Sequence, residues 1–74
     1  MHNKSVADLK PGEVGTIKGF TDSFISLKLM EMGCLPGSSI KMNYAAPLGD
    51  PISYYVAGCN LTLRISEASA ILIE

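Results

Sequence analysis

The sequence predicts a small, mainly β domain: a strongly curved sheet of about five strands with one short helix between the first and second strands. Apolar and polar residues alternate along several short runs, which is the period of half-buried strands. The chain has only 74 residues, and a closed or half-open barrel limits the free edges of so many short strands. We therefore expect a small SH3-like barrel, with an OB-like barrel as the alternative.

One helix is predicted from about Asp22 to Met32. The carboxylate of Asp22 can accept hydrogen bonds from the free amides of the first turn, as N-cap residues do. Gly33 follows the helix at the position where a left-handed residue commonly ends it, and Pro36-Gly37 then sets a turn. We therefore expect the helix to stop sharply before the second strand.

The helical period places three apolar residues on one stripe, which we assign to the core: Ile25, Leu29 and Met32. Phe24 points away from this stripe, with folding under into the core as an alternative. Leu27 and Met30 point elsewhere around the helix, so they are either exposed or covered by the preceding loop. Glu31 is an isolated acidic residue on this helix, and we interpret its side chain as exposed to solvent.

The expected strands are Glu13–Phe20, Ser39–Ala45, Ile52–Ala57, Asn60–Ile65 and Ala70–Glu74. Single helical turns are expected over Ser5–Leu9 and after Ser66 as N-cap, and Gly15 and Gly19 are expected to bend the first strand. Alternation places two trios on inward faces: Ile40 with Met42 and Tyr44, and Ile52 with Tyr54 and Val56. Ile65 is expected inside as well. The predicted core comprises Ile25, Leu29, Met32, Ile40, Leu61, Leu63, Ile71 and Ile73.

The segment Ala46–Pro51 is predicted to be a hairpin loop with a proline near each end. Leu48 at its tip is unusual, because loop tips are generally polar. Either Leu48 projects as a contact residue or it folds back to cap the barrel. Asp50 has a structural interpretation, a loop carboxylate that bonds nearby backbone amides. Tyr55 is expected on the outward face of the strand that follows.

Composition excludes some functions. The formal net charge is −1, charged residues make up 18%, and no basic run occurs, which argues against binding to a nucleic-acid backbone. The apolar share of 47% is high for so short a chain, so a partner surface is expected. Neither a secretion leader nor an apolar run of membrane-spanning length is present in the sequence, so we expect a cytoplasmic protein without membrane insertion.

We expect no catalytic residue, no cofactor and no metal site. The acidic residues are scattered one by one, and the one histidine, His2, lies in the N-terminal segment Met1–Lys4, which is expected to be loosely ordered. The two cysteines, Cys34 and Cys59, are far apart in sequence and form no Cys-x-x-Cys motif. They are interpreted as small core residues.

Three segments in register resemble the ferrous iron transport protein A family, FeoA. Leu29–Gly37 (LMEMGCLPG) is similar to the family segment L-x-E-M-G-x-x-P-G, and Ala46–Pro51 (APLGDP) to its loop. The ending, from Gly58 through Leu61-Thr62-Leu63-Arg64 to Glu67-Ala68 and Ile71, is similar too. Cys34 stands where the family usually has an aliphatic residue. The resemblance covers nearly the whole chain.

The resemblance implies an SH3-like barrel that acts as a cytoplasmic accessory module of FeoB, the GTPase-bearing ferrous iron permease, and is recruited by it to the inner face of the membrane. Weak self-association is a further expectation. The alternatives are a regulatory domain related to the C-terminal domain of iron-dependent repressors and an OB-like nucleic-acid binder. The residues expected to contact the partner are Leu27, Met30, Leu48, Asp50 and Tyr55.

Overall fold

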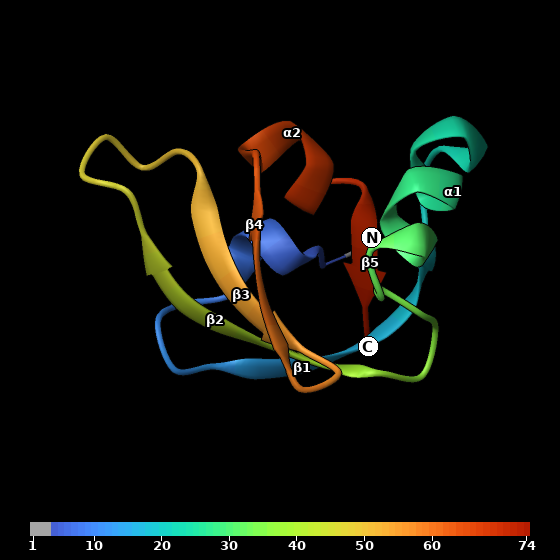
Figure 1. Ribbon diagram of the computed structural model, residues 1–74, viewed down its shortest axis with the longest axis horizontal. Coiled ribbons are helices and arrows are strands. Elements are labelled where there is room, and N and C mark those ends of the chain that lie inside the picture. The colour runs from blue at the N-terminus through green and yellow to red at the C-terminus, as the bar shows by residue number, and fades with distance from the viewer. Residues whose placement is uncertain (1–3) are drawn as a thin grey trace.

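The computed structural model describes residues 4–74, so the expectation of a loose N-terminus lies, for residues 1–3, outside the described residues. The chain forms five strands. The elements in chain order are η1 (Val6–Asp8, a 3₁₀ turn), β1 (Val14–Phe20), α1 (Ser23–Glu31), β2 (Ser39–Ala45), β3 (Ile52–Val56), β4 (Cys59–Leu63), α2 (Ile65–Ala68) and β5 (Ile71–Ile73). Figure 1 shows the strands curled into a barrel, with helices α1 and α2 along one edge.

The strands form one antiparallel sheet in the order β4-β3-β2-β1-β5. The sheet curls until it forms a half-open barrel, with β4 and β5 as its edge strands. The predicted fold class, mainly β with the helix α1 between the first two strands, is confirmed. Part of the curvature of the sheet arises in β1. Its pairing with β5 shifts between Ile17 and Gly19, as in a β-bulge.

The core lies inside this curl and includes side chains from every strand. Leu29, Ile40, Leu63, Ile71 and Ile73 are buried as predicted. Ile25 and Leu61 are half-buried and pack against the core. The core also contains Val6, Leu9, Ile17, Cys34, Met42, Ile52, Tyr54, Val56 and Ala68.

The prediction for Met32 was wrong, because its side chain is 38% exposed. The helix ends in a Schellman arrangement: the amide of Cys34 donates to the carbonyl of Leu29 (3.0 Å), and that of Gly33 to Met30 (3.0 Å). Gly33 has the expected left-handed backbone, with φ of 103°. This reversal carries Cys34 into the core in place of Met32, and Cys34 is fully buried.

Two more inward assignments were wrong. In β2 the pairing with β3 shifts between Met42 and Tyr44, and the extra residue turns Tyr44 outward, where it is 65% exposed. Ile65 begins α2 instead of ending β4, so the strand period no longer applies to it and its side chain is exposed. The N-cap of that turn is Arg64, and not Ser66 as expected.

Candidate functional site

The loop between β2 and β3 presents Leu48 to solvent. The amide of Gly49 donates to the carbonyl of Ala46 (2.7 Å), which closes a tight turn around Pro47-Leu48. A second bond from the amide of Ala46 to the carbonyl of Pro51 (2.9 Å) closes the base of the loop. The side chain of Leu48 is 96% exposed. The alternative that Leu48 folds back to cap the barrel is therefore wrong.

Helix α1 exposes a second apolar group. Asp22 caps it as predicted, because its Oδ1 accepts from the amide of Phe24 (2.8 Å). Phe24 does not fold into the core and is 87% exposed, and Leu27 one turn on is exposed as well. Together with Ser23, Lys28 and Glu31 these two side chains line an open depression on the outer side of the helix. Since only Leu29 of α1 is buried, most of the helix surface is available for contact.

Helix α2 connects the loop and α1 through polar contacts. Oδ1 of Asp50 in the loop accepts a hydrogen bond from the amide of Ile65, the first residue of α2 (2.9 Å). On the other side, Nζ of Lys28 in α1 donates to Oε2 of Glu67 in α2 (2.8 Å). Oε1 of Glu67 accepts from the amide of Arg64 (2.9 Å). The hydrogen bond from Lys28 and the one from the Arg64 amide both lower the pKa of Glu67.

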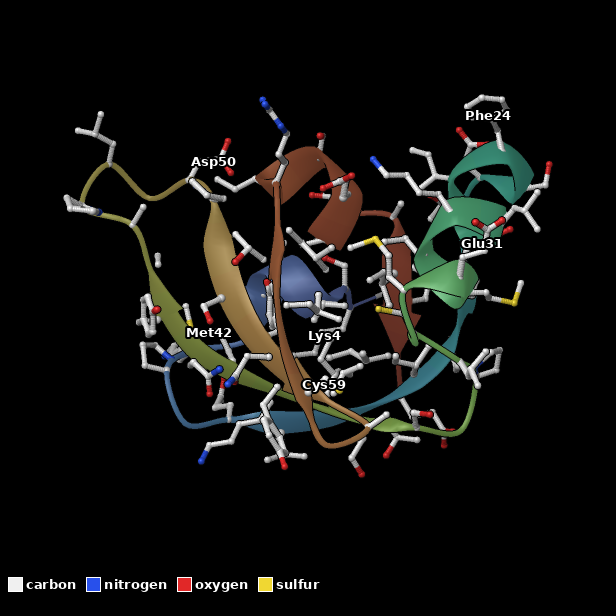
Figure 2. The ribbon with its side chains drawn as sticks, viewed as in Figure 1. Lys4, Phe24, Glu31, Met42, Asp50 and Cys59 are labelled. Carbon is white, nitrogen blue, oxygen red and sulfur yellow. The ribbon has the colours of Figure 1, made fainter. Side chains whose placement is uncertain are left out.

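These contacts join the loop, α2 and α1 along one edge of the barrel (Figure 1), and we call the exposed apolar side chains of this edge the apolar rim. It is defined by four exposed side chains, namely Phe24 and Leu27 on α1, Leu48 on the loop and Ile65 on α2. In Figure 1 the loop, α2 and α1 follow one another along the upper edge of the molecule. Figure 2 shows Asp50 and Phe24 on that edge and Cys59 near the opposite one.

Of the residues expected to contact a partner, Leu48 and Asp50 share one loop, whereas Leu27 lies on α1 at the other end of the same edge (Figure 1). Met30 is exposed on α1 but does not line the depression that Leu27 shares with Phe24. Tyr55 does not lie with Leu48. It follows Pro51 by four residues of β3, about 13 Å of extended chain, and faces a separate depression beside Lys41 and Val14.

Phe24 and Ile65 are rim residues that the sequence reasoning did not name as contact residues. Phe24 could have been found, because in the helical period it lies with Leu27, Lys28 and Glu31 and not with the buried Leu29. Ile65 carried no such signal. Its position continues the alternation of β4, and only the start of α2 reverses its direction.

The polar groups offer little reactive chemistry. Within residues 4–74 no cluster of three or more His, Cys, Asp or Glu side chains is placed to hold a metal ion. Cys34 is a core residue as expected, and burial raises the pKa of its thiol. The core assignment of Cys59 was wrong, because Cys59 is exposed on the edge strand β4. His2 lies outside the described residues. That the chain has no tight ferrous iron site stays a prediction, which anaerobic iron titration would test.

The geometry defines a small SH3-like barrel with an exposed apolar rim. Along the part of the chain that is described, no helix has both the length and the apolar character needed to cross a bilayer. The family model described as "FeoA domain" matches residues 4–74. The chain belongs to the FeoA family, which is associated with ferrous iron transport and is not known as a family of enzymes.

Solved structures agree. The NMR structure of a FeoA-like protein from Clostridium acetobutylicum superimposes with a TM-score of 0.89 at 33% identity, over 100% of this chain and 88% of that one. The solution structure of iron(II) transport protein A from Clostridium thermocellum gives a TM-score of 0.88 at 38% identity, over 96% of this chain and 44% of that one.

More distant structures share the fold alone. Stenotrophomonas maltophilia FeoA, crystallised with zinc and described as a prokaryotic SH3 domain protein, gives a TM-score of 0.82 at 22% identity over 96% of this chain and 89% of that one. A manganese-dependent transcriptional repressor gives 0.83 at 17% identity over 95% of this chain, which spans 40% of the repressor. The SH3-like assignment is thereby confirmed over the OB-like alternative.

Proposed function

We propose that this protein is a cytoplasmic accessory protein of ferrous iron uptake, which binds a FeoB-type membrane GTPase through the apolar rim and is recruited by it to the inner face of the membrane. Membership of the FeoA family and the name of the Clostridium thermocellum relative, iron(II) transport protein A, support the connection with iron. The observation that carries the docking surface is the near-complete exposure of Leu48 and Phe24, on a loop and a helix that lie along one edge of the barrel (Figure 1).

The rim is suited to binding because its apolar groups are exposed before any partner arrives. Transfer of a leucine or phenylalanine side chain from water into an interface contributes about 1.5–3 kcal/mol. The turn around Leu48 is already closed by a backbone hydrogen bond and flanked by two prolines, so little ordering entropy is lost on binding. The Lys28–Glu67 and Asp50–Ile65 contacts hold the three segments in one arrangement.

Such a module acts on its partner by preferential binding. An adaptor changes the activity of a GTPase or permease only if it binds one conformation more tightly than another. We infer that the rim recognises an apolar surface that FeoB exposes in one of its states. The effect on iron uptake then follows from the shift in FeoB populations.

The test compares two rim variants with two variants elsewhere. Leu48→Ser and Phe24→Ser remove exposed side chains from the rim, and Leu35→Ser is the matched control, because Leu35 is a 48% exposed leucine in the turn between α1 and β2. Tyr55→Ala tests whether the depression beside Lys41 forms a second contact. Each protein replaces the cells' own copy, and FeoB co-purification and uptake of radioactive ferrous iron are measured.

The proposal expects both rim variants to fold normally and to lose FeoB association and uptake together, while Leu35→Ser keeps both. Loss with Tyr55→Ala in addition would add the second depression to the contact. Full association and uptake by both rim variants would contradict the proposal. So would a loss that is confined to Tyr55→Ala.

A further inference from the structure

Strand β4 is an open edge of the sheet. Its ladder partner is β3, and in the order β4-β3-β2-β1-β5 no strand lies on its other side. The opposite edge, β5, is partly covered, because Ser5 forms a bridge with Leu72 and the amide of Ile73 donates to the carbonyl of Lys4 (3.0 Å). The half-open barrel therefore leaves one edge strand available, in the foreground of Figure 1.

The hairpin geometry shows which backbone groups of β4 are free. Ala57 and Gly58 between β3 and β4 both have positive φ, 51° and 83°, as a two-residue type I′ turn requires. The residues flanking such a turn, Val56 and Cys59, form a hydrogen-bonded pair, and such pairs recur at every second position. The backbone N–H and C=O groups of Asn60 and Thr62 therefore point away from β3. Among residues 4–74 these groups have no backbone partner.

Natural edge strands are commonly protected by charges, prolines or bulges, and β4 has none of these. The segment Cys59–Leu63 (CNLTL) contains no charged residue and no proline. Its pairing with β3 runs through five consecutive residue pairs without a shift, whereas β1 and β2 each contain one. Asn60 and Thr62 are both exposed.

We propose that β4 pairs with β4 of a second copy of this chain, antiparallel, about a two-fold axis at Leu61. This inference does not depend on the proposed binding of FeoB. In this register Asn60 of each copy lies opposite Thr62 of the other. Each of the two pairs exchanges two backbone hydrogen bonds, so all outward groups of both residues are satisfied. Any other register leaves some of them without a strand partner.

We choose a second copy of this chain as the partner of β4 because the strand is compatible with itself. Across a two-fold axis every side chain meets its own strand, and a charged residue on β4 would be brought near its like-charged copy. The uncharged segment Cys59–Leu63 avoids this repulsion. Its outward backbone groups, alternating donor and acceptor on Asn60 and Thr62, are complementary to themselves when the strand is turned around.

The first test measures association of the whole chain by sedimentation velocity and amide exchange by NMR, from micromolar to millimolar concentration. The dimer fraction should rise with concentration, and exchange of the Asn60 and Thr62 amides should slow with it. Thr62→Pro removes an outward N–H that the hairpin does not use, and should weaken the dimer by about tenfold or more. Thr62→Lys should also weaken the dimer, because it introduces a charge on the edge strand. Thr21→Lys is the control for added charge, because Thr21 is exposed but lies outside β4.

The second test fixes the register by cross-linking. In a Cys59→Ser background, Leu61→Cys places a thiol on the two-fold axis and should form an intermolecular disulfide. The native Cys59 is two residues from the axis, so the two copies of it are separated by four residues along the strands, about 13 Å, which is beyond disulfide reach. Wild-type protein should therefore cross-link far more slowly than Leu61→Cys, although Cys59 is exposed.

The proposal is overturned if the wild-type chain stays monomeric at millimolar concentration, as it would if this edge took only a strand of another protein. It is equally overturned if association is lost in Leu48→Ser or Phe24→Ser and kept in a folded Thr62→Lys protein. In that case the rim, and not β4, would be the self-association surface.

Discussion

Strand β3 and helix α1 are both rich in apolar residues and use them in opposite ways. In β3, Ile52, Tyr54 and Val56 are buried, and the alternate residues face outward. In α1 only Leu29 is buried, while Phe24 and Leu27 are exposed. Apolar content alone therefore does not separate core from surface in this domain. In the sheet the apolar residues form the core, and on the helix most of them are exposed to solvent.

The difference follows from the number of neighbours that each element has. Strand β3 lies between β2 and β4, so one of its faces is enclosed by the curl of the sheet. Helix α1 rests against the barrel on one side and is held there by Leu29, the half-buried Ile25 and the turn that follows. A helix with one neighbouring layer buries one stripe, and its remaining apolar residues stay outside.

The largest effect expected from this comparison is that of Leu29→Ala. Removal of a fully buried leucine side chain should lower the free energy of unfolding by about 2–5 kcal/mol, which is a large share of the stability of a small domain. Leu27→Ala, two residues away but exposed, should change it by no more than about 0.5 kcal/mol. Urea denaturation measures both. Equal losses of unfolding free energy in the two variants would contradict the assignment of a buried and an exposed face to α1.

Tyr54 tests the core side of the comparison. Its hydroxyl donates to the carbonyl of Val6 (3.1 Å) in the interior, and that carbonyl also accepts from the amide of Leu9 (3.1 Å). Because the acceptor keeps this second bond, Tyr54→Phe should cost about 0.5–1.5 kcal/mol, the net contribution of one hydrogen bond. Burial, and secondarily the charge of Asp8, raises the pKa of Tyr54 from 10.0 to about 12.

The unfolded chain therefore ionises Tyr54 first. Its contribution to stability is complete below the unfolded pKa and is lost as the pH rises through the folded value. In denaturation experiments between about pH 10 and pH 12, wild-type protein should lose this contribution and Tyr54→Phe should not. Parallel pH curves for the two proteins would show that the hydroxyl is not buried in solution.

Glu67 tests the polar contacts that hold the rim together, and a smaller effect is expected. Its folded-state pKa is lowered, first by the hydrogen bond from Lys28, so its contribution is present above the unfolded pKa and is lost as the pH falls through the folded value. Because Lys28 is largely exposed, Glu67→Gln should cost no more than about 1 kcal/mol at neutral pH. Below the folded pKa the two proteins should have equal stability, and a constant difference at all pH values would argue against an ionic origin.

The smallest effect is expected at the exposed end of the rim. Phe24→Ser and Leu48→Ser should change the free energy of unfolding by no more than about 0.5 kcal/mol, because nearly all of each side chain is already in water. The melting temperatures of both variants should match that of the wild type. A clear loss of stability would mean that the rim packs against the barrel, and its assignment as a docking surface would fail.

Local rules predicted much of the architecture. The N-cap at Asp22 and the left-handed Gly33 were correct because each depends on a few neighbouring residues, and the same is true of the hairpin turn at Gly58. The alternation of β3 correctly placed Ile52, Tyr54 and Val56 inside. Of the candidate site, Leu27 and Leu48 were named as contact residues with exposure as one of two alternatives for each, and both are exposed, whereas Phe24 and Ile65 were not named.

The sequence by itself determined which elements form, because periodicity, caps and turn residues act over a few positions of the chain. Tertiary structure decided which apolar residues those elements leave in water. The bulge before Tyr44 arises from pairing with β3, and the burial of Cys34 in place of Met32 from the reversal that seats α1 on the barrel. The rim exists only because the contacts Asp50–Ile65 and Lys28–Glu67 join segments that lie 15 and 39 residues apart in sequence. Pairings of that range depend on how the whole sheet curls, which no local pattern encodes.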